Sequence, residues 1–304
     1  MLREFFLFLS RASWAQAAIT HFPPSRRMAR RFVAGSTIEE TLPTLKTLNQ
    51  QGMHATVDFL GESVATADEA RKASDEYLRA LVQIAEHGVR ANVSLKLTQF
   101  GLDIDHALCV ENVLRVVEKA RACGTFVRID MEGTPHTDRT LAVVDALRRS
   151  HDWVGTVLQA YLYRTEQDCR DLAYEGSRIR LCKGAYKEPE SVAFQAKEDV
   201  DKAYVRCMRI LFDSPCYPMI ASHDPRLVEI AGALATRADR AKGTYEHQML
   251  YGVRPDEQRR LAKAGERMRV YIPYGAEWYG YMVRRMAEKP ANMALFVKSM
   301  TSKS

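Results

Sequence analysis

Short β-rich runs alternate with long amphipathic stretches from about residue 53 towards the end of the chain. Strict alternation of apolar and polar positions predicts a strand, and apolar positions that recur every three or four residues predict a helix. The predicted strands are 54–59, 92–97, 126–131, 155–160, 178–183, 217–222, 243–247 and 268–272. The predicted helices are 67–87, 106–122, 138–150, 165–175, 192–213, 225–237, 255–264 and 276–288, and Pro290 ends the last one.

Regular alternation of strands and helices predicts a parallel sheet. Eight strands and eight helices over about 235 residues have the size of a (β/α)8 barrel, an α/β fold. A doubly wound sheet is the main alternative, but it often carries a glycine-rich phosphate loop, and neither G-x-G-x-x-G nor G-x-x-x-x-G-K-[ST] occurs here. We therefore expect an N-terminal helical arm over 1–45, a barrel over 46–292 with its last helix above the mouth, and a C-terminal tail over 293–304.

The composition is that of an ordinary globular protein. Of the 304 residues, 46% are hydrophobic and 27% are charged, which allows a large core. The net charge of +6 favours anionic ligands, but no basic segment carries interleaved aromatic residues, so we expect no nucleic-acid partner. The six cysteines include no C-x-x-C pair and no zinc-ligand spacing, which predicts free thiols in a reducing compartment and no bound metal.

The apolar segments are too short to anchor the chain in a membrane. None reaches the roughly 18 residues of a membrane-spanning helix, so we expect a cytoplasmic protein. The apolar run 5–9 is also too soon interrupted to be a signal peptide. It leaves open a peripheral contact with the inner face of the membrane, although packing onto the barrel is the simpler interpretation.

The last predicted helix carries a compact group of polar side chains. At about 100° per residue, Tyr281, Arg284, Arg285 and Glu288 fall in one narrow sector, which Glu277 joins one turn earlier. Arginine suits bidentate binding of a carboxylate or phosphate, so this sector predicts a binding site for a small anion. A solvated helix face with i,i+4 ion pairs is the alternative that the helix alone leaves open.

Unusual polar residues also fall near the ends of the predicted strands, where barrels of this kind gather their chemistry. They are Lys96, Asp130, Gln159, Arg180, Lys183, Ser222, His223, Asp224, Glu246 and Tyr271. A single charged strand end is usually a structural ion pair, and a nearby arginine explains Glu246 equally well. Convergence of the whole set on one mouth indicates a ligand site instead, because buried charges are costly unless they are paired or bound.

The segment after the fifth predicted strand, Lys183-Gly184-Ala185-Tyr186, has a chemistry of its own. A glycine at a strand end lets a ligand approach the backbone closely, which suits a phosphate or a flat ring. Tyr186 stands at a spacing that allows it to stack on or cover such a ring. As a phosphate motif, the segment is weak by itself.

Taken in order, these segments resemble the proline dehydrogenase family, the flavoenzymes that oxidise L-proline to Δ1-pyrroline-5-carboxylate. The resemblance covers roughly residues 53 to 292. Because the chain carries no extension of aldehyde-dehydrogenase length, it looks like the monofunctional type and not the fused bifunctional one. The matching segments are Val93-Ser-Leu-Lys-Leu97, Val127-Arg-Ile-Asp-Met-Glu132, Val157-Leu-Gln-Ala-Tyr161, Ile179-Arg-Leu-Cys-Lys-Gly-Ala-Tyr186, Ala221-Ser-His-Asp224, Tyr245-Glu-His-Gln-Met-Leu-Tyr-Gly252, and Tyr281-Met-Val-Arg-Arg-Met-Ala-Glu288 with Asn292 after it.

The resemblance implies a (β/α)8 barrel that binds FAD noncovalently and transfers a hydride from proline C5 to the flavin. It assigns the proline carboxylate to Lys96, Arg284 and Arg285. It assigns the aromatic walls around the substrate ring to Tyr271 and Tyr281. The positions that match active-site residues beside flavin and substrate are Asp130 and Arg180, and those that match flavin contacts are Met131, Gln159, Arg180, Lys183, Gly184, Ala185, Ser222, His223 and Glu288.

Two positions depart from the family pattern. Some relatives have Trp where this chain has Lys187, and the sixth-strand motif ends in Asp224 where Asn is frequent. The role of Asp130 also stays open, because it can hold Arg180, hold Lys96 or accept a proton.

The family resemblance also implies partners. L-Proline is the expected substrate, a membrane quinone the expected electron acceptor, and a pyrroline-5-carboxylate dehydrogenase a candidate partner. The nearest alternative is a flavin-dependent oxidoreductase of another cyclic imino acid, such as hydroxyproline or pipecolate, although a bulky Tyr281 disfavours a ring hydroxyl. An alternative of another class is a noncatalytic barrel that senses DNA or a metabolite, against which the lack of an added DNA-binding segment argues.

Overall fold

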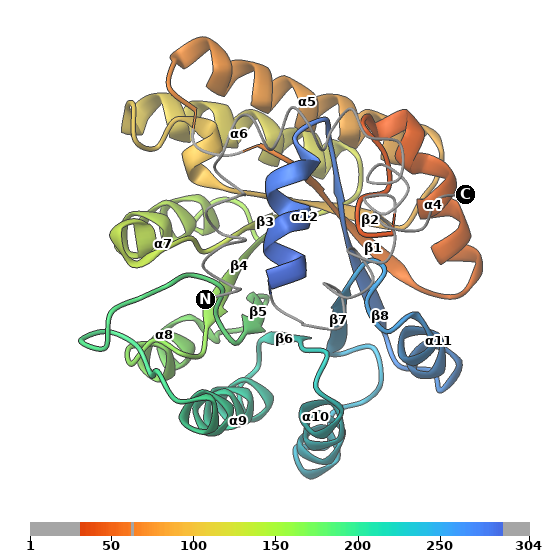
Figure 1. Ribbon diagram of the computed structural model, residues 1–304, viewed down its shortest axis with the longest axis vertical. Helices are drawn as coiled ribbons and strands as arrows, with labels where there is room; N and C mark the ends of the chain where they lie inside the picture. Colours follow the sequence, from red (N-terminus) through yellow and green to blue (C-terminus); the bar gives the residue numbers. More distant parts are fainter. Residues whose placement is uncertain (1–30, 62–63, 288–304) are drawn as a thin grey trace, which may run out of the picture.

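A closed barrel of eight parallel strands forms the centre of the computed structural model, and helices surround it (Figure 1). The structure describes residues 31–61 and 64–287, with side chains up to Met282. The strands pair in chain order, and β1 pairs with β8 to close the barrel, so the predicted (β/α)8 fold is confirmed. The strands are β1 (His54–Phe59), β2 (Ala91–Leu95), β3 (Val127–Ile129), β4 (Val154–Gln159), β5 (Arg178–Cys182), β6 (Tyr217–Ala221), β7 (Glu246–Leu250) and β8 (Met268–Tyr274).

The helices begin where the sequence offers suitable caps. For α5, the Thr66 hydroxyl accepts from Glu69 N at 3.2 Å, and the Glu69 carboxylate accepts from Thr66 N at 3.2 Å, which is a capping box. The described helices are α4 (Ile38–Gln50), α5 (Ala67–Glu86), the 3-10 helix η1 (Leu97–Phe100), α6 (His106–Ala122), α7 (Thr134–Arg148), α8 (Thr165–Leu172), α9 (Lys197–Asp213), α10 (Pro225–Arg237), α11 (Pro255–Lys263) and α12 (Trp278–Ala287). None of these described helices has the length and apolar character needed to cross a lipid bilayer.

The seventh strand lies further along the chain than its apolar pattern predicts. Gly243 adopts a φ of +88°, and Thr244 N donates to Ala241 O at 3.1 Å, so these residues form a turn. The strand therefore begins at Glu246, which puts this residue at the opposite end of the barrel from the strand ends. The prediction that Glu246 closes the seventh strand was wrong, and its carboxylate pairs with the guanidinium of Arg269, Nε to Oε1 at 2.7 Å.

Other element boundaries also differ from the predicted ones by a few residues. Helix α9 begins only at Lys197, because Phe194 N donates to Tyr161 O at 2.8 Å and ties the preceding residues to the end of β4. Helix α4 crosses the predicted boundary between residues 45 and 46, and its Leu45 is fully buried in the main apolar cluster. The extent of the N-terminal arm stays a prediction, because residues 1–30 lie outside the described part of the chain, as does the tail 293–304.

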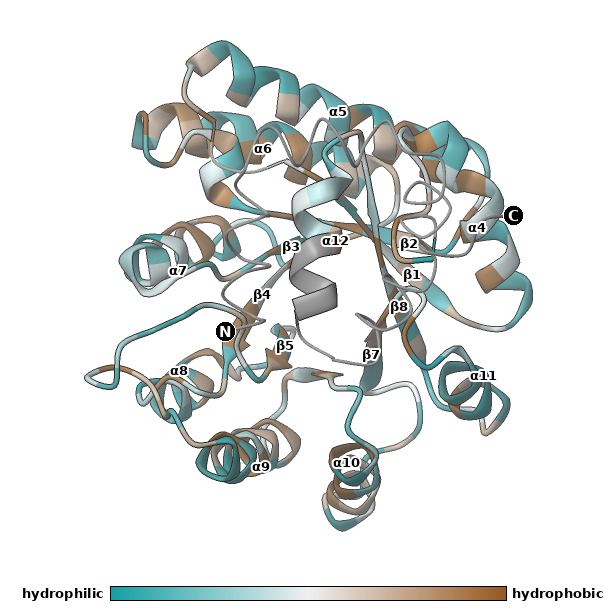
Figure 2. Ribbon diagram, in the orientation of Figure 1, coloured by the Kyte–Doolittle hydropathy of each residue, from teal (hydrophilic) through white to brown (hydrophobic). Residues whose placement is uncertain are grey.

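Apolar side chains fill the layer between the barrel and its helices. The helices are apolar on the side towards the strands and polar on the outer side (Figure 2). The inside of the barrel, by contrast, is rich in buried polar groups. Arg128 on β3 reaches across to Met219 on β6, its Nη2 3.2 Å from the sulfur, so charged side chains occupy the barrel interior itself.

Candidate active site

The predicted site residues within the described chain gather at the end of the barrel where the strands finish. Parallel strands bring their carboxyl ends to the same mouth. Helix α12, which follows β8, lies across this mouth (Figure 1). The predicted residues that the strand ends and the following loops bring together are Lys96, Asp130, Met131, Gln159, Arg180, Lys183, Gly184, Ala185, Ser222, His223 and Tyr271.

Asp130 is the centre of a buried hydrogen-bond cluster. Its Oδ1 accepts from Ser94 Oγ at 2.5 Å and from Arg180 Nη2 at 2.9 Å, and its Oδ2 accepts from the Tyr271 hydroxyl at 3.1 Å. The Arg180 guanidinium also lies 5.1 Å from the centre of the Tyr271 ring, in cation–π contact. Burial favours the neutral carboxyl, but the charges of Arg180 and Lys96 outweigh it and hold the pKa of Asp130 below its ordinary value. Asp130 is therefore an ionised acceptor that fixes Arg180 and Tyr271.

Lys96 pairs with a carboxylate that the sequence analysis missed, that of Asp58 in β1. Lys96 Nζ lies 3.0 and 3.1 Å from the two oxygens of Asp58. Burial acts to lower the pKa of Lys96, but Asp58 and Asp130 outweigh it and leave this pKa above its ordinary value. Burial also dominates at Asp58 and raises its pKa despite the neighbouring ammonium. The available signal was the alternation of Thr56 and Asp58 with apolar residues along the first strand.

Tyr77 of α5 also reaches this cluster. Its hydroxyl donates to Ser94 O at 2.9 Å and lies 3.4 Å from Asp58 Oδ1. The side chain is fully buried, and burial raises the pKa of Tyr77 well above its ordinary value. Helical spacing identifies Tyr77 only as an inward-facing residue, so its polar contacts were not predictable from the sequence pattern.

A chain of hydrogen bonds, which we call the Glu132 bridge, joins four neighbouring segments of the mouth. It runs through Thr98 in η1, Glu132 after β3, Gln159 at the end of β4 and Ala185 after β5. The Glu132 carboxylate accepts from Thr98 N at 3.1 Å and from Thr98 Oγ1 at 2.7 Å. The Glu132 carbonyl accepts from Gln159 Nε2 at 2.9 Å, and Gln159 Oε1 accepts from Ala185 N at 3.2 Å. These two partners fix the orientation of the Gln159 amide. The bridge thus connects the segment after Lys96 to the loop after β5.

The loop after β5 starts with a glycine that no other residue can replace without strain. Gly184 has a φ of +133°, and a Cβ there would lie 2.3 Å from the Tyr161 ring. Packing against Tyr161 is therefore a reason for the glycine that is independent of any ligand. The preceding Lys183 is held by Asp201 of α9 at 2.5 Å and by Asp224 at 3.5 Å.

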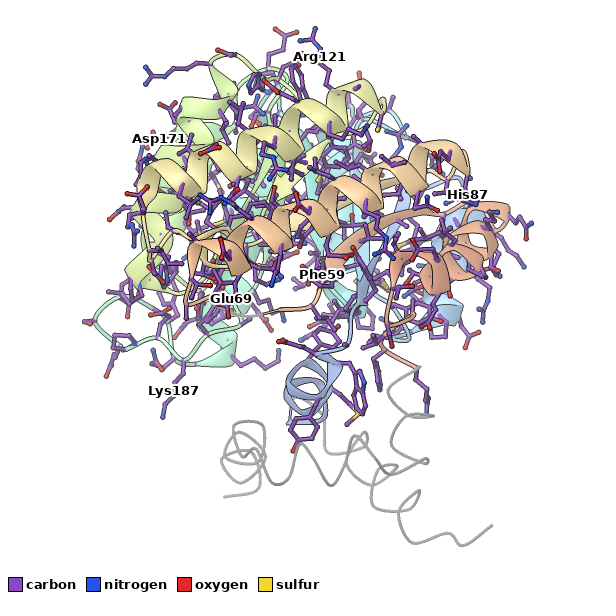
Figure 3. The ribbon with its side chains drawn as sticks, turned by 90° about the horizontal axis from the view of Figure 1, so that it is seen from above. Phe59, Glu69, His87, Arg121, Asp171 and Lys187 are labelled. Carbon is purple, nitrogen blue, oxygen red and sulfur yellow. The ribbon has the colours of Figure 1, made fainter. Side chains whose placement is uncertain are left out.

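A cavity of about 300 Å³ adjoins this loop. Its lining includes Tyr161, Lys183, Gly184, Lys187, Phe194 and Lys197. The Tyr161 hydroxyl is buried and has no hydrogen-bond partner among the described residues. Lys187 lies on the same side of the molecule as α12, whereas Arg121 is on the far side (Figure 3). The lining carries three ammonium groups, one carboxylate (Glu188) and three aromatic rings, a balance that suits an anionic ligand with an aromatic part.

Ser222 and His223 follow β6 at the same mouth. The Ser222 hydroxyl accepts from Asp224 N at 3.1 Å, and His223 Nε2 accepts from Leu250 N at 2.9 Å. Because Nε2 accepts this bond, a neutral His223 ring carries its proton on Nδ1. Arg254 Nη1 donates to the His223 carbonyl at 2.7 Å, which fixes the backbone of this loop.

The structure describes the side chains of only some of the predicted site residues in and after α12. Tyr281 is 8% exposed and packs in an apolar cluster with Phe32, Val33 and Leu60. Arg284 and Arg285 belong to α12 but follow the last side chain that the structure describes. Glu288 lies outside the described residues, so the roles of these three side chains stay predictions.

Comparisons with known proteins identify the family. The family model for proline dehydrogenase matches residues 41–298. Proline dehydrogenase 2 of Bacillus subtilis (strain 168) is 42% identical over 301 residues, which cover 99% of each chain. The proline dehydrogenase of Deinococcus radiodurans is 36% identical over 280 residues, 90% of each chain. The chain belongs to the proline dehydrogenase family.

The fold of this proline dehydrogenase family member agrees with that of a larger solved protein. The crystal structure of proline utilization A from Bdellovibrio bacteriovorus inactivated by N-propargylglycine matches with a TM-score of 0.80 at 27% identity. The match covers 87% of this chain but only 33% of that one, so this chain spans about a third of its length. Within the described residues of this chain, no group of three or more His, Cys, Asp or Glu side chains is arranged to hold a metal ion.

Proposed function

We propose that this chain oxidises L-proline to Δ1-pyrroline-5-carboxylate and uses noncovalently bound FAD as the hydride acceptor. Membership of the proline dehydrogenase family supports the substrate. The observation that carries the proposal is the buried mouth cluster in which Asp130 fixes Arg180 and Tyr271 beside the pair Lys96–Asp58. A fixed cluster of two cations and an aromatic ring suits a small cyclic amino acid.

The substrate carboxylate meets the cationic part of this cluster. The Lys96 side chain is only partly buried, at 25% exposed, and Asp58 Oδ1 holds its ammonium at 3.0 Å. We assign Arg284 and Arg285 of α12 to the same carboxylate, because they lie on the helix that crosses the mouth. Three cations around one carboxylate orient the ring of proline and so lower the entropic part of the barrier.

Asp130 serves this reaction as a positioning group. Its two oxygens already accept three hydrogen bonds, and its pKa is held below its ordinary value. Of the roles that the sequence left open, this geometry supports holding Arg180 and not proton acceptance. Lys96 is held by Asp58 instead.

The residues after β3 to β6 fit the cofactor. FAD, when bound, supplies the hydride acceptor. We assign it to Met131, Gln159, Arg180, Lys183, Gly184, Ala185, Ser222, His223 and Glu288. The buried Tyr161 hydroxyl, which has no hydrogen-bond partner in the described part of the chain, and the lysines of the adjoining cavity suit the polar and anionic parts of a dinucleotide. Arg180 and Lys183 add positive charge that favours an electron-rich ring.

The further partners rest on the family resemblance. We assign the role of electron acceptor to a membrane quinone and that of a downstream partner to a pyrroline-5-carboxylate dehydrogenase. A cytoplasmic location, with contact at the inner face of the membrane, is the corresponding expectation. A membrane-vesicle assay with a quinone analogue tests the acceptor.

An anaerobic titration of the purified protein with L-proline tests the function. The flavin absorbance should bleach in proportion to the proline added, with one pyrroline-5-carboxylate formed for each flavin reduced. Bleaching by pipecolate or hydroxyproline but not by proline would favour another imino acid as substrate. Flavin that no imino acid bleaches would favour a noncatalytic sensing barrel.

Two variants test the assigned residues in the same assay. Arg284→Lys should raise the Michaelis constant for proline strongly while flavin stays bound, because a lysine cannot form the bidentate contact. Gln159→Ala should weaken flavin retention more than proline binding, because Gln159 fixes Ala185 N. Unchanged kinetics in the first variant, or the reverse order of effects in the second, would contradict these assignments.

A further inference from the structure

The interior of the barrel holds buried cations and carboxylates that pair almost completely. Three ion pairs follow one another through the barrel, and each contains one cation and one carboxylate. They are Lys96–Asp58 at 3.0 Å, Arg180–Asp130 at 2.9 Å and Arg269–Glu246 at 2.7 Å. Pairing of this kind offsets most of the cost of taking the charges out of water.

Among the described residues, Arg128 is a fully buried cation that has no carboxylate partner. It lies on β3, two residues before Asp130, and its exposed fraction is 0%. Its Nη1 donates to Thr56 Oγ1 at 3.4 Å, and its Nη2 lies 3.2 Å from Met219 Sδ. Both partners are neutral, and one is a thioether, a weak acceptor. Nε has no partner in the described part of the chain.

The charge of Arg128 is therefore compensated by no ion pair within the described residues. Burial and the charge of Arg180 lower the pKa of Arg128 to about 9, although the more distant carboxylates Glu246 and Asp130 act in the opposite direction. The guanidinium therefore stays protonated at neutral pH. A water molecule at Nε would satisfy the N–H group but would not neutralise the charge. An unpaired buried cation is costly, and apolar residues in such places are often as stable or more stable. The position calls for a reason other than stability.

We propose that Arg128 is an electrostatic positioning residue, whose unpaired charge makes the floor of the active site positive and is compensated when an anionic ligand occupies the mouth. The inference rests on the proposed function, which brings a carboxylate and an electron-rich ring to this end of the barrel. Asp130, the first residue after β3, belongs to the mouth cluster, so Arg128, two residues earlier, lies about 7 Å below that cluster. Burial keeps solvent ions from screening the charge over this distance.

Arg128 acts through its neighbours as well as through space. Its charge contributes to holding the pKa of Asp130 low, together with Arg180 and Lys96. Removal of Arg128 should therefore raise the pKa of Asp130 and weaken the hydrogen bond by which Asp130 holds Arg180. A residue that served packing alone would not change the affinity of the mouth for charged ligands relative to neutral ones.

A pair of probes that differ only in charge tests the proposal. Cyclopentanecarboxylate and cyclopentanecarboxamide have the ring size of proline but present no amine to oxidise. We expect Arg128→Met to weaken binding of the carboxylate on the order of tenfold, as for a unit charge about 10 Å away at a dielectric constant of about 20, and to leave the carboxamide unchanged. The midpoint potential of the bound flavin should fall in the same variant, and the melting temperature should stay the same or rise.

Two further variants complete the experiment. Arg128→Lys keeps the charge and should restore most of the carboxylate affinity and of the potential. Arg178→Met removes a half-buried cation from the first residue of β5, at the opposite end of the barrel. Its guanidinium lies 4.9 Å from the centre of the Phe126 ring, which Arg128 also contacts at 5.6 Å, so this variant controls for the shared ring contact. This control should leave both readouts near the wild-type values.

The outcomes separate this inference from the proposed function. Equal loss of carboxylate and carboxamide in Arg128→Met, or equal damage in Arg128→Lys and Arg128→Met, would overturn the electrostatic role. A fall in melting temperature with unchanged discrimination would overturn it too. If proline fails to bleach the flavin of the wild-type protein, the proposed function fails, but the two probes still report on Arg128.

Discussion

Replacement of Glu132 by alanine tests whether the Glu132 bridge positions the active site. Glu132 is 8% exposed, and its carboxylate takes both hydrogen bonds that Thr98 offers, at 3.1 and 2.7 Å. Its carbonyl holds Gln159, which in turn holds Ala185. In Glu132→Ala, both hydrogen bonds between Thr98 and the Glu132 carboxylate are lost. The hydrogen bond from Gln159 to the Glu132 carbonyl remains, but the side chain no longer helps to hold that carbonyl in place.

The structure sets the expected size of the effect. A hydrogen bond to a charged group contributes about 1.5–3 kcal/mol, and two are lost, so the free energy of unfolding should fall by about 3 kcal/mol or more. At about 2–4 °C per kcal/mol for a large domain, the melting temperature should drop by about 6–12 °C. A displacement of about 1 Å in a positioned group costs up to about 100-fold in rate, so kcat/KM for proline should fall by about 10- to 100-fold.

Two control variants separate positioning from stability. In Glu132→Gln, Oε1 still accepts from Thr98 N, and the new amide N–H donates to the Thr98 hydroxyl, which can accept as well as donate. This variant should retain most of the activity. Ser74→Ala removes a buried hydroxyl that donates to Asn112 O at 3.1 Å between α5 and α6, away from the mouth. It should lower the melting temperature modestly and leave kcat/KM and flavin content unchanged.

The assay measures kcat and KM for proline, the flavin-to-protein ratio after gel filtration, and the melting temperature of each variant. The reasoning is refuted if Glu132→Ala melts lower by the expected amount but keeps wild-type kcat/KM and flavin content. It is also refuted if Glu132→Gln is as damaging as Glu132→Ala, because the charge rather than the geometry of the bridge would then matter.

Three further predictions concern other parts of the barrel. Asp58→Asn should lower the pKa of Lys96, so the loss of cyclopentanecarboxylate affinity at alkaline pH should begin at a lower pH than in the wild type. Gly184→Ala should release flavin and lower the melting temperature, because its Cβ would lie 2.3 Å from an aromatic ring, whereas Gly52→Ala, with open space around it, should cost only about 1 kcal/mol. Burial lowers the pKa of His54 from 6.5 to about 4, so the unfolded chain binds more protons between these values and stability falls as the pH is lowered through them. The urea midpoint of His54→Gln should therefore decline less between pH 6.5 and 4.

The sequence predicts the barrel because each element carries its own periodicity. Helix α6 spans His106–Ala122 as predicted, and β1 spans His54–Phe59 as predicted, since both have clear apolar spacing and distinct ends. The seventh strand was misplaced because Thr244 and Tyr245 have strand-like side chains while Gly243 directs a turn. The turn at this one glycine thus places Glu246 at the opposite end of the barrel from the mouth, where the sequence had predicted it.

The partners within the site were harder to predict than its members. Lys96 and Asp130 are recognisable as polar residues at strand ends, but the sequence does not say which cation each carboxylate holds. Lys96 and Asp58 are separated by 38 positions, and their contact depends on the register of β1 against β2. Tyr77 enters the site from a helix, where spacing reveals burial but not the direction of a hydroxyl.

The charged residues in the barrel interior also explain why the strands could be predicted from the sequence pattern. Strands of an all-parallel sheet are usually buried on both faces and read as continuous apolar runs. Here the residues that face the barrel interior are largely polar, as Asp58 and Arg128 illustrate, whereas their outward neighbours Val57 and Ile129 pack under helices. The alternation that predicts each strand therefore comes from the polar interior. Ion pairs account for most of these interior charges, whereas Arg128 has no ion-pair partner among the described residues, which is why its charge is the one that an anionic ligand would offset.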